Sequence, residues 1–217
     1  MKKEPTSIRF CFDFVSPYAY LAWTQIHRIA KKHDRSVEIW PALFAAMLDA
    51  HGTKGPAEVP AKRAYVFKDA YRKAHAFGLP PLSPPPAHPF NPLLALRVCS
   101  LPMDDETKRS LVDRLYAATW AGGGGIDTPE KVTAIAGAEL VRQAQTEDAK
   151  SRLRRQTEEA IAAGAFGVPT IFADGELFWG VDSLPALEAR LAGNDPIDAV
   201  SLSKWATLPA SAQRKSR

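Results

Sequence analysis

The sequence predicts a mixed α/β protein in which strand-forming segments at the two ends of the chain flank a long helical middle. Three patterns support this prediction. Residues 8–43 read as strand, helix, strand, residues 170–180 read as two short apolar runs joined by Asp174-Gly175, and the segments between them are mostly amphipathic helices. A strand, helix, strand order with short connections favours a βαβ unit with two parallel strands.

The N-terminal end contains the first strand, a helix and the second strand. Every second residue over 8–14 is a large apolar residue, which is typical of a strand. A helix is predicted from Pro17 to Lys32, and a second strand over 37–43, "VEIWPAL". Ser16 stands directly before this helix, where a serine hydroxyl caps a free backbone N–H group and proline suits the first turn.

The middle of the chain is predicted to be helical. Helices are expected over 61–77, 93–100, 105–120, 128–140 and 146–163. On the first of these helices, Ala64, Phe67, Tyr71, Ala74 and Phe77 fall along one side and form the predicted buried face. The segment between the first two, "GLPPLSPPPAHPFNP", is rich in proline and predicts an extended connector.

The chain divides, on this basis, into a strand-containing domain and an inserted helical domain. The first would comprise 1–44 and 164–217, and the insertion 45–163. A last helix is predicted over 182–191, and the tail from Asn194 is predicted to be mostly irregular.

Composition excludes several classes of function. The chain has 217 residues, 46% of them hydrophobic, and a net charge of +4 from 28 basic and 24 acidic side chains. No basic stripe with interleaved aromatic residues is present, so nucleic acid is not an expected partner. No stretch approaches the length of a membrane span and no signal peptide is recognisable, so we expect a cytoplasmic protein. Cys11 and Cys99 form neither a CxxC motif nor a Cys/His cluster, which gives no support to a dithiol or a metal site.

The stretch "FDFVSPYAYLAW" places Ser16 where the strand passes into the helix. One interpretation is an ordinary helix cap. The other is an anion site, because the N-terminus of a helix presents free N–H groups and a positive dipole end that stabilise thiolates. A second motif, "FGVPT", places Pro169 directly before the hairpin; a cis Val168–Pro169 bond would make that proline a functional element, and a trans bond an ordinary strand start.

Together these motifs resemble a known family. The order of "DFVSPYAYLA", "KGPAEVPAKRAYVFKDAYRKAHAFGLP", "HPFNPLLALR", "GAFGVPTIFADGELFWGVD" and "WATLPASAQRK" is similar to that of the 2-hydroxychromene-2-carboxylate isomerases and the related kappa-class glutathione transferases. The resemblance implies a thioredoxin-like fold of the DsbA type with a large all-helical insertion. Ser16 and Ala19 stand where the DsbA dithiol would be, so disulfide exchange by that route is excluded.

The resemblance also implies a glutathione cofactor and an isomerase activity. In the family, the glutathione thiol adds to ring-opened 2-hydroxychromene-2-carboxylate and leaves again after bond rotation, giving trans-o-hydroxybenzylidenepyruvate. Its sulfur would lie against Ser16, its backbone would pair with Val168, and its γ-glutamyl end would lie near the start of the last helix. The implied glutathione contacts are Ser16, Lys62, Val168, Pro169, Val181 and Asp182, with Ser16 as the catalytic residue.

Further candidates would contact the aromatic carboxylate substrate. They are Tyr18, Lys62, Tyr65 and Asn91. Lys62, Tyr65 and Asp69 share a helix face, where Lys62 could meet a carboxylate or simply be a solvated lysine. Asn91 could bind substrate or form a turn between prolines, and Tyr18 could face the substrate or the core.

Two positions that depart from the family leave the glutathione contacts open there, and one histidine has no assigned role. Thr53 and Ser183 differ from the residues common in the family, and His88 in the connector is expected to be a surface histidine. The alternatives to an isomerase are a transferase that conjugates glutathione to electrophiles and a non-catalytic thioredoxin-like binding module. A homodimer is expected by resemblance alone.

Overall fold

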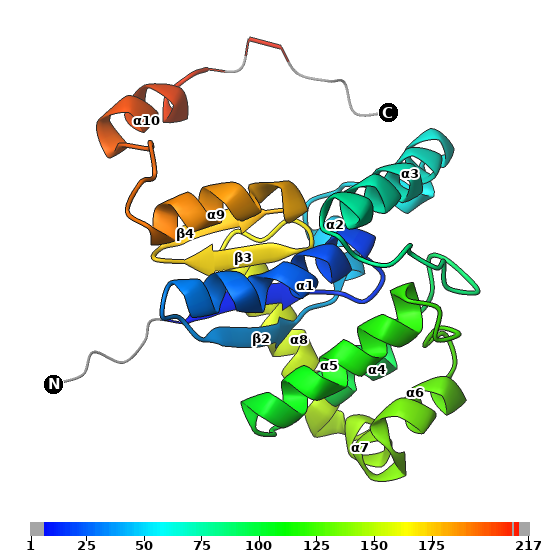
Figure 1. Ribbon diagram of the computed structural model, residues 1–217. Helices are drawn as coiled ribbons and strands as arrows, with labels where there is room; N and C mark the ends of the chain where they lie inside the picture. Colours follow the sequence, from blue (N-terminus) through cyan, green and yellow to red (C-terminus); the bar gives the residue numbers. More distant parts are fainter. Residues whose placement is uncertain (1–6, 210, 213–217) are drawn as a thin grey trace, which may run out of the picture.

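Four strands form one mixed sheet at the centre of the protein. The computed structural model describes residues 7–209 and 211–212. The strands run in the order β2-β1-β3-β4 across the sheet (Figure 1). Their bounds are β1 Ile8–Phe12, β2 Val37–Pro41, β3 Thr170–Ala173 and β4 Glu176–Trp179.

The strand pairing joins the two ends of the sequence. β1 pairs in parallel with β2, with Phe10 opposite Ile39, and antiparallel with β3. β3 and β4 form a hairpin whose turn residues Asp174 and Gly175 have φ of 49° and 80°. Two positive φ values are those of a type I′ turn, which suits the twist of a hairpin. The parallel pair and the hairpin are therefore confirmed.

Helices cover both faces of the sheet. Helix α1, Pro17–Lys32, packs beside α9, Leu184–Leu191, on one face, and α8, Glu147–Ala162, lies across the other (Figure 1). The aromatic residues Phe10, Phe12, Trp23 and Tyr116 pack against one another in the largest buried cluster. This core fixes the position of α1, which begins after the short turn of residues 13–16 that follows β1.

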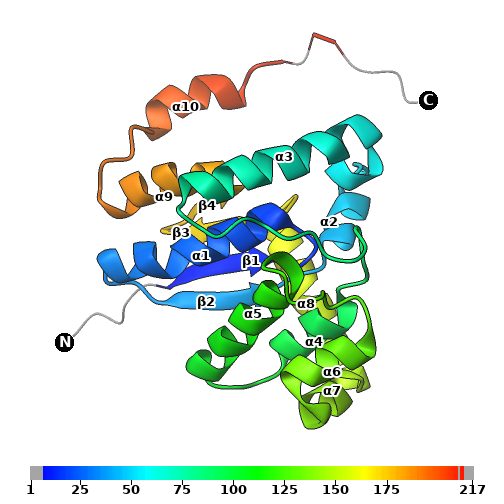
Figure 2. The same cartoon turned by 45° about the vertical axis from the view of Figure 1, so that its right-hand side comes forward.

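The helices between β2 and β3 occupy two sides of the molecule. α3 lies above the sheet in both views, and α4 to α7 lie below it (Figure 2). Their bounds are α2 Phe44–Ala50, η1 Pro56–Glu58, α3 Pro60–Ala76, α4 Leu93–Ser100, α5 Asp105–Trp120, α6 Pro129–Ala136 and α7 Ala138–Ala144. Every element from α2 to α8 is helical, but the division of the chain into two domains stays a prediction.

The helices of the structure differ in three places from those predicted from the sequence. The single helix expected over 128–140 is two helices, because Gly137 has φ 88° and ψ 150° and breaks the backbone ladder between α6 and α7. Helix α2, Phe44–Ala50, was not predicted. The tail after 194 contains α10, Ala199–Ala206, which lies beyond α9 on the side away from the sheet (Figures 1 and 2).

The predicted apolar face of α3 is only partly buried. Ala70 and Ala74 are the buried residues of this helix, whereas Tyr71 and Phe77 are exposed. Helix α3 packs against α1 through small residues, so only a narrow stripe is covered. The larger aromatic side chains on either side of the stripe remain in contact with solvent.

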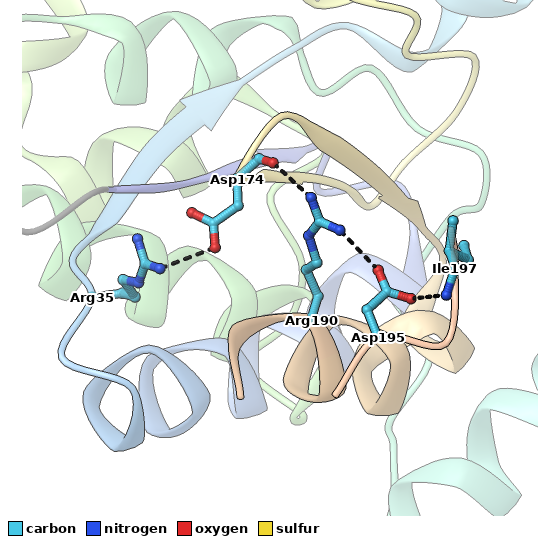
Figure 3. A network of polar contacts seen from close by, with 5 residues as sticks. All are labelled: Arg35, Asp174, Arg190, Asp195 and Ile197. Carbon is cyan, nitrogen blue, oxygen red and sulfur yellow. Dashed lines mark hydrogen bonds and ion pairs between the residues drawn. The ribbon is translucent and has the colours of Figure 1, made fainter. Parts of the chain in front are cut away.

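A polar network ties the hairpin turn to the segments after α1 and α9. The Arg35 guanidinium pairs with the Asp174 carboxylate at 3.0 Å, and Arg190 donates to the Asp174 carbonyl at 3.2 Å (Figure 3). Arg190 also pairs with Asp195 at 3.3 Å, and Asp195 accepts a hydrogen bond from the Ile197 N–H at 3.1 Å. The hairpin and the end of α9 are thereby held together at the end of the sheet where α1 finishes.

Among the described residues, no helix is long and apolar enough to cross a membrane. The same residues contain no group of three or more histidine, cysteine or acidic side chains arranged to hold a metal ion.

Candidate active site

Ser16 caps the N-terminus of α1. Its backbone is extended, with φ −93° and ψ 115°, and its Oγ accepts a hydrogen bond from the Ala19 N–H at 3.2 Å. Pro17 has no N–H and the Tyr20 N–H bonds to the Ser16 carbonyl, so the Tyr18 N–H is the remaining donor of the first turn. The helix dipole adds a partial positive charge there, which favours an anion beside Ser16.

The Ser16 hydroxyl also reaches across to the loop before the hairpin. Its Oγ donates to the carbonyl oxygen of Val168 at 3.3 Å, a contact between residues 152 positions apart in the sequence. The Val168–Pro169 peptide bond is cis, and the Pro169 carbonyl accepts from the Gly180 N–H at 2.9 Å. The helix start, the loop before the hairpin and the segment after it therefore meet at one place.

A buried carboxylate supports the turn that carries Ser16. Asp13 is 1% exposed, and its two oxygens accept from the Val15 N–H at 3.0 Å and the Phe44 N–H at 2.9 Å. Burial raises the pKa of Asp13 to about 6, although these two hydrogen bonds oppose the rise. The Ser16 N–H bonds to the Asp13 carbonyl at 3.1 Å, so Asp13 shapes the turn through both its side chain and its backbone.

Two aromatic side chains hold the carbonyl groups of the same turn. Trp120 Nε1 donates to the Phe14 carbonyl at 3.0 Å, and His88 Nε2 lies 2.8 Å from the Val15 carbonyl. Since a carbonyl only accepts, Nε2 carries the proton. Burial lowers the pKa of His88 and so favours the neutral ring. His88 is half-buried, with its ring edge-on to Trp120, and the expectation of a surface histidine was wrong.

Four charged or polar side chains link α1, α3 and the segment after β4. The Tyr18 hydroxyl donates to Asp69 at 2.8 Å. The Lys73 ammonium lies 3.0 Å from Asp69 and 3.1 Å from Asp182, which belongs to η2, Val181–Ser183. The Lys73 side chain is 24% exposed and that of Asp182 is 79% exposed, so the linkage runs from a half-buried tyrosine out to the surface.

These contacts fix the ionisation of the linked groups. Partial burial acts to raise the pKa of Asp69, but hydrogen bonds from Lys73 and Tyr18 outweigh it and lower the pKa. Burial acts to lower the pKa of Lys73, but its bonds to Asp69 and Asp182 outweigh it and raise the pKa. Burial and the bond to Asp69 both raise the pKa of Tyr18. At neutral pH the carboxylate of Asp69 and the ammonium of Lys73 are therefore charged and the Tyr18 phenol is neutral.

The contacts form a closed circuit around the start of α1, which we call the site ring. It passes from Ser16 to the Val168–Pro169 loop, from there to Gly180 and η2, then through Lys73 and Asp69 to Tyr18, which is two residues after Ser16 in the chain. One side of the ring offers the Ser16 hydroxyl, the Tyr18 N–H and the Val168 carbonyl. The opposite side offers the charged groups of Asp69, Lys73 and Asp182.

The remaining predicted residues lie at varied distances from this ring. Lys62 and Tyr65 are exposed on α3, two turns and one turn before Asp69. Tyr65 stands four residues before Asp69 in α3 and so lies on the same face of the helix as that member of the ring. The Asn91 carboxamide oxygen accepts from the Leu93 N–H at 3.0 Å, as expected for its alternative interpretation as a turn residue. Their roles as ligand contacts stay predictions.

Of the two positions that differ from the family, Thr53 is exposed and Ser183 is engaged locally. Ser183 Oγ donates to the Gly180 carbonyl at 2.7 Å. Ser183 therefore stabilises the turn that presents Asp182.

An aromatic pair flanks the Val168–Pro169 loop. Trp179, the last residue of β4, is 54% exposed, and its ring lies 5.0 Å from that of Phe166. A Cβ added to Gly167 would meet Trp179 Nε1 at 2.7 Å, so the indole lies directly on this glycine. Trp179 thus ends a strand and also covers the back of the loop.

Sequence reasoning missed Asp13, Trp120 and Lys73. Asp13 could have been noticed, because a carboxylate directly after an apolar strand and before the Ser16 turn is unusual for a buried segment. The roles of Trp120 and Lys73 depend on contacts with residues more than 100 positions away and left no local signal.

Comparison with protein families agrees with this geometry. The DSBA-like thioredoxin domain matches residues 7–192, which is most of the chain. The chain belongs to this family. The turn that carries Ser16 contains no cysteine, and Cys11 and Cys99, the two cysteines of the chain, are both buried and unpaired. Burial raises the pKa of both thiols, to about 12 for Cys11, so neither the site nor the core supplies a reactive protein thiol.

Several curated proteins are similar along most of their length. The 2-hydroxychromene-2-carboxylate isomerase of Pseudomonas putida is 27% identical over 193 residues, covering 85% of this chain and 93% of that protein. The isomerase of the same name from Sphingobium xenophagum is 28% identical and covers 85% and 97%. Glutathione S-transferase kappa 2 of Caenorhabditis elegans is 27% identical and covers 85% and 91%.

Solved structures show the same fold. A structure of 2-hydroxychromene-2-carboxylate isomerase superposes with a TM-score of 0.77 at 24% identity, covering 93% of this chain and 99% of the other. The cytosolic disulfide reductase DsbM of Pseudomonas aeruginosa superposes with a TM-score of 0.57 at 16% identity, covering 93% and 100%. The expected DsbA-type thioredoxin-like fold is confirmed.

Proposed function

We propose that this protein is a glutathione-dependent isomerase that interconverts 2-hydroxychromene-2-carboxylate and trans-o-hydroxybenzylidenepyruvate in the catabolism of aromatic hydrocarbons. The observation that carries the proposal is Ser16, a hydroxyl at a helix N-terminus that bonds to the carbonyl before Pro169 where the family has a cysteine. Relatives named as isomerases and as kappa transferases support the reaction class.

The groups around Ser16 suit a thiolate brought by a ligand. The Ser16 hydroxyl has one proton, which is directed to the Val168 carbonyl at 3.3 Å, a long distance for an O–H···O bond. Turning this proton toward a sulfur anion would exchange a weak neutral hydrogen bond for a charge-assisted one. The Tyr18 N–H and the dipole of α1 act on the same position.

The same rotation would release the Val168 carbonyl. Freed from Ser16, this oxygen could accept an N–H from the backbone of a peptide ligand. Val168 is buried and its loop is tied to η2 by the bond from the Gly180 N–H to the Pro169 carbonyl, so its orientation is already set. One proton movement thus prepares the sulfur position and the peptide position together.

Glutathione, when bound, supplies the thiol nucleophile that adds to the unsaturated substrate and leaves unchanged. The chain's own residues would bind and orient it. Ser16, Val168 and Pro169 would hold the cysteinyl part, Val181 and Asp182 the γ-glutamyl part, and Lys62 a carboxylate. Tyr18, Tyr65 and Asn91 remain the proposed contacts of the aromatic substrate.

A second function has a specific observation in its favour. Kappa-class transferases are as similar to this chain as some isomerases are, and the site ring has no feature that requires release of the thiol. A kappa-like conjugation of glutathione to an electrophile would use the same residues. A non-catalytic binding module would also keep the fold but would not depend on the Ser16 hydroxyl.

Product analysis separates these functions. Purified protein would be mixed with 2-hydroxychromene-2-carboxylate, with and without glutathione, while substrate absorbance and free thiol are both followed. Isomerisation that requires glutathione and leaves the free thiol constant would support the proposal. Loss of free thiol with a general electrophile, without isomerisation, would replace it with the transferase.

The Ser16→Ala variant is the test against a binding module. Conversion should fall by at least about 100-fold, the scale on which one preorganised donor to a developing anion acts. Ser100→Ala is the matched control, because Ser100 is also a buried serine but bonds only to Arg97 within its own helix. Unchanged turnover in Ser16→Ala would show that the hydroxyl is only a helix cap.

A further inference from the structure

The chain continues past the family domain into a helix that stands apart from the rest of the molecule. The DSBA-like match ends at residue 192, and α10, Ala199–Ala206, follows after a short non-helical segment. Asp198 starts the helix, because its Oδ1 accepts from the Val200 N–H at 2.9 Å. α10 makes no extensive contact with another described helix or strand, and both views show it separated from α9 (Figures 1 and 2).

One side of α10 is apolar and exposed to solvent. Leu202, Trp205 and Leu208 recur at intervals of three, which places them in one stripe along the helix and its end. Their exposed fractions are 44%, 71% and 64%, respectively. On another side, the hydroxyls of Ser203 and Thr207 bond back to carbonyls of the helix. A helix of 8 residues is too short to be stable alone in water, so α10 gains stability from a surface that covers this stripe.

The charges in and after α10 are all positive. Residues 199–217 contain Lys204, Arg214, Lys215 and Arg217 and no acidic residue. These four charges equal the net charge of +4 of the whole chain, so the charges of the other residues balance one another. A short apolar stripe with an indole, accompanied by cations, is typical of helices that lie on anionic lipid.

We propose that α10 and the basic residues after it bind the protein to an anionic lipid surface, with Leu202, Trp205 and Leu208 in the interface and the cations at the lipid head groups. The indole of tryptophan suits the boundary between head groups and hydrocarbon. Leucine side chains suit hydrocarbon and offer nucleic-acid bases no ring to stack on, which favours lipid over nucleic acid.

A second copy of this chain is a poorer partner for α10. The exposed aromatic residues Tyr65 and Tyr71 of α3 could cover an apolar stripe. They lie among exposed Lys62, Lys68 and Arg72, whose charges would repel the cations that accompany α10. These cations of α3 also favour an anionic surface, because α3 and α10 lie on the same side of the sheet in both views (Figures 1 and 2).

Sedimentation with lipid vesicles tests the proposal on the full chain. One kind of vesicle is phosphatidylcholine alone, and the other contains about a quarter of phosphatidylglycerol. The wild type should bind only the second kind, and high salt should release it because salt screens the charges. Leu202→Ser combined with Trp205→Ser should weaken binding at least about tenfold, since less apolar surface enters the lipid. Trp179→Ser is the matched control, because Trp179 is also exposed but lies on β4 against Phe166.

A second variant separates the charges from the apolar contact. Glutamine in place of the three cations in 214–217 should weaken binding about 100-fold, at about fivefold for each charge. Its matched control combines Arg109→Gln, Arg154→Gln and Arg155→Gln, which remove three exposed cations from α5 and α8 and should change binding by less than about threefold. Unfolding temperatures of all variants would show that each is folded.

The contrary outcomes are distinct. If the wild type binds neither kind of vesicle, the proposal fails, and a dimer that dissociates in the Leu202 and Trp205 variant would show by light scattering that α10 joins a second copy. If the control on α5 and α8 loses as much binding as the 214–217 variant, only net charge matters and the role of this segment is wrong. Binding of a single-stranded RNA in place of vesicles would assign the basic segment to nucleic acid. The proposed function does not depend on any of these results.

Discussion

The buried carboxylate beneath the Ser16 turn gives a pH dependence that can be isolated. Asp13 accepts two backbone hydrogen bonds in a site that excludes water, and burial raises its pKa from 3.8 to about 6. A carboxyl group whose pKa is raised by folding binds more protons in the folded state between these two values. Its contribution to stability is therefore fully present below about pH 3.8 and is lost as the pH rises through about 6.

The size of this effect follows from the pKa difference. A shift of about two units corresponds to about 3 kcal/mol in total, at about 1.4 kcal/mol per unit. Between about pH 8 and pH 4.5, roughly 2 kcal/mol of this should be visible. In Asp13→Asn the side chain no longer titrates, so the free energy of unfolding of the wild type, relative to the variant, should increase by that amount as the pH falls.

Urea unfolding of both proteins across this range measures the difference. Subtraction is required because His27 and His88 act in the opposite sense. Burial lowers the pKa of both, to about 4 for His27, so their contributions are lost as the pH falls below about 6.5. A wild-type-minus-variant difference that stays flat, or that decreases toward low pH, would refute a raised pKa for Asp13.

Three further substitutions test the supports of the fold. Trp120→Phe leaves the buried Phe14 carbonyl without its donor and should lower the free energy of unfolding by about 1–3 kcal/mol in urea titration; a loss below about 0.5 kcal/mol would contradict the role of this bond. Gly175→Ala meets no atom within 4 Å, so its loss of about 1 kcal/mol should come only from the positive φ, and an unchanged melting temperature would contradict the type I′ turn. Arg190→Met removes the partly exposed pair with Asp195 and should cost no more than about 1 kcal/mol (Figure 3); a loss above about 2 kcal/mol would show that the network is cooperative.

The elements predicted correctly are those whose signal is local. The parity of apolar residues in β1, the Ser16-Pro17 start of α1 and the Asp174-Gly175 turn each lie within a few neighbouring residues. Helix α2 was missed because it follows β2 after two residues and the composition changes little between them. The break at Gly137 was missed because a single glycine inside a helical pattern is often tolerated.

The site residues also fall into those that a local motif predicts and those that only long-range contacts bring together. Ser16 and Pro169 could be predicted because each stands in a recognisable motif, and the structure joins them through Val168. The contact of Lys73 with Asp182 could not be predicted, because it depends on how α3 is placed relative to η2, the short helix directly before α9. The predicted lysine on that helix was Lys62, which is exposed and lies three turns away along α3.

In the proposed function, Ser16 holds a thiolate that a ligand brings, because the protein has no reactive thiol of its own. The most direct test is a pH titration of the thiolate absorbance of glutathione bound to the wild type and to Ser16→Ala. We expect the pKa of the bound thiol to be at least about one unit lower on the wild type than in free glutathione, and most of this shift to be lost in the variant. A bound thiol that titrates like free glutathione, or an equal shift in both proteins, would contradict it.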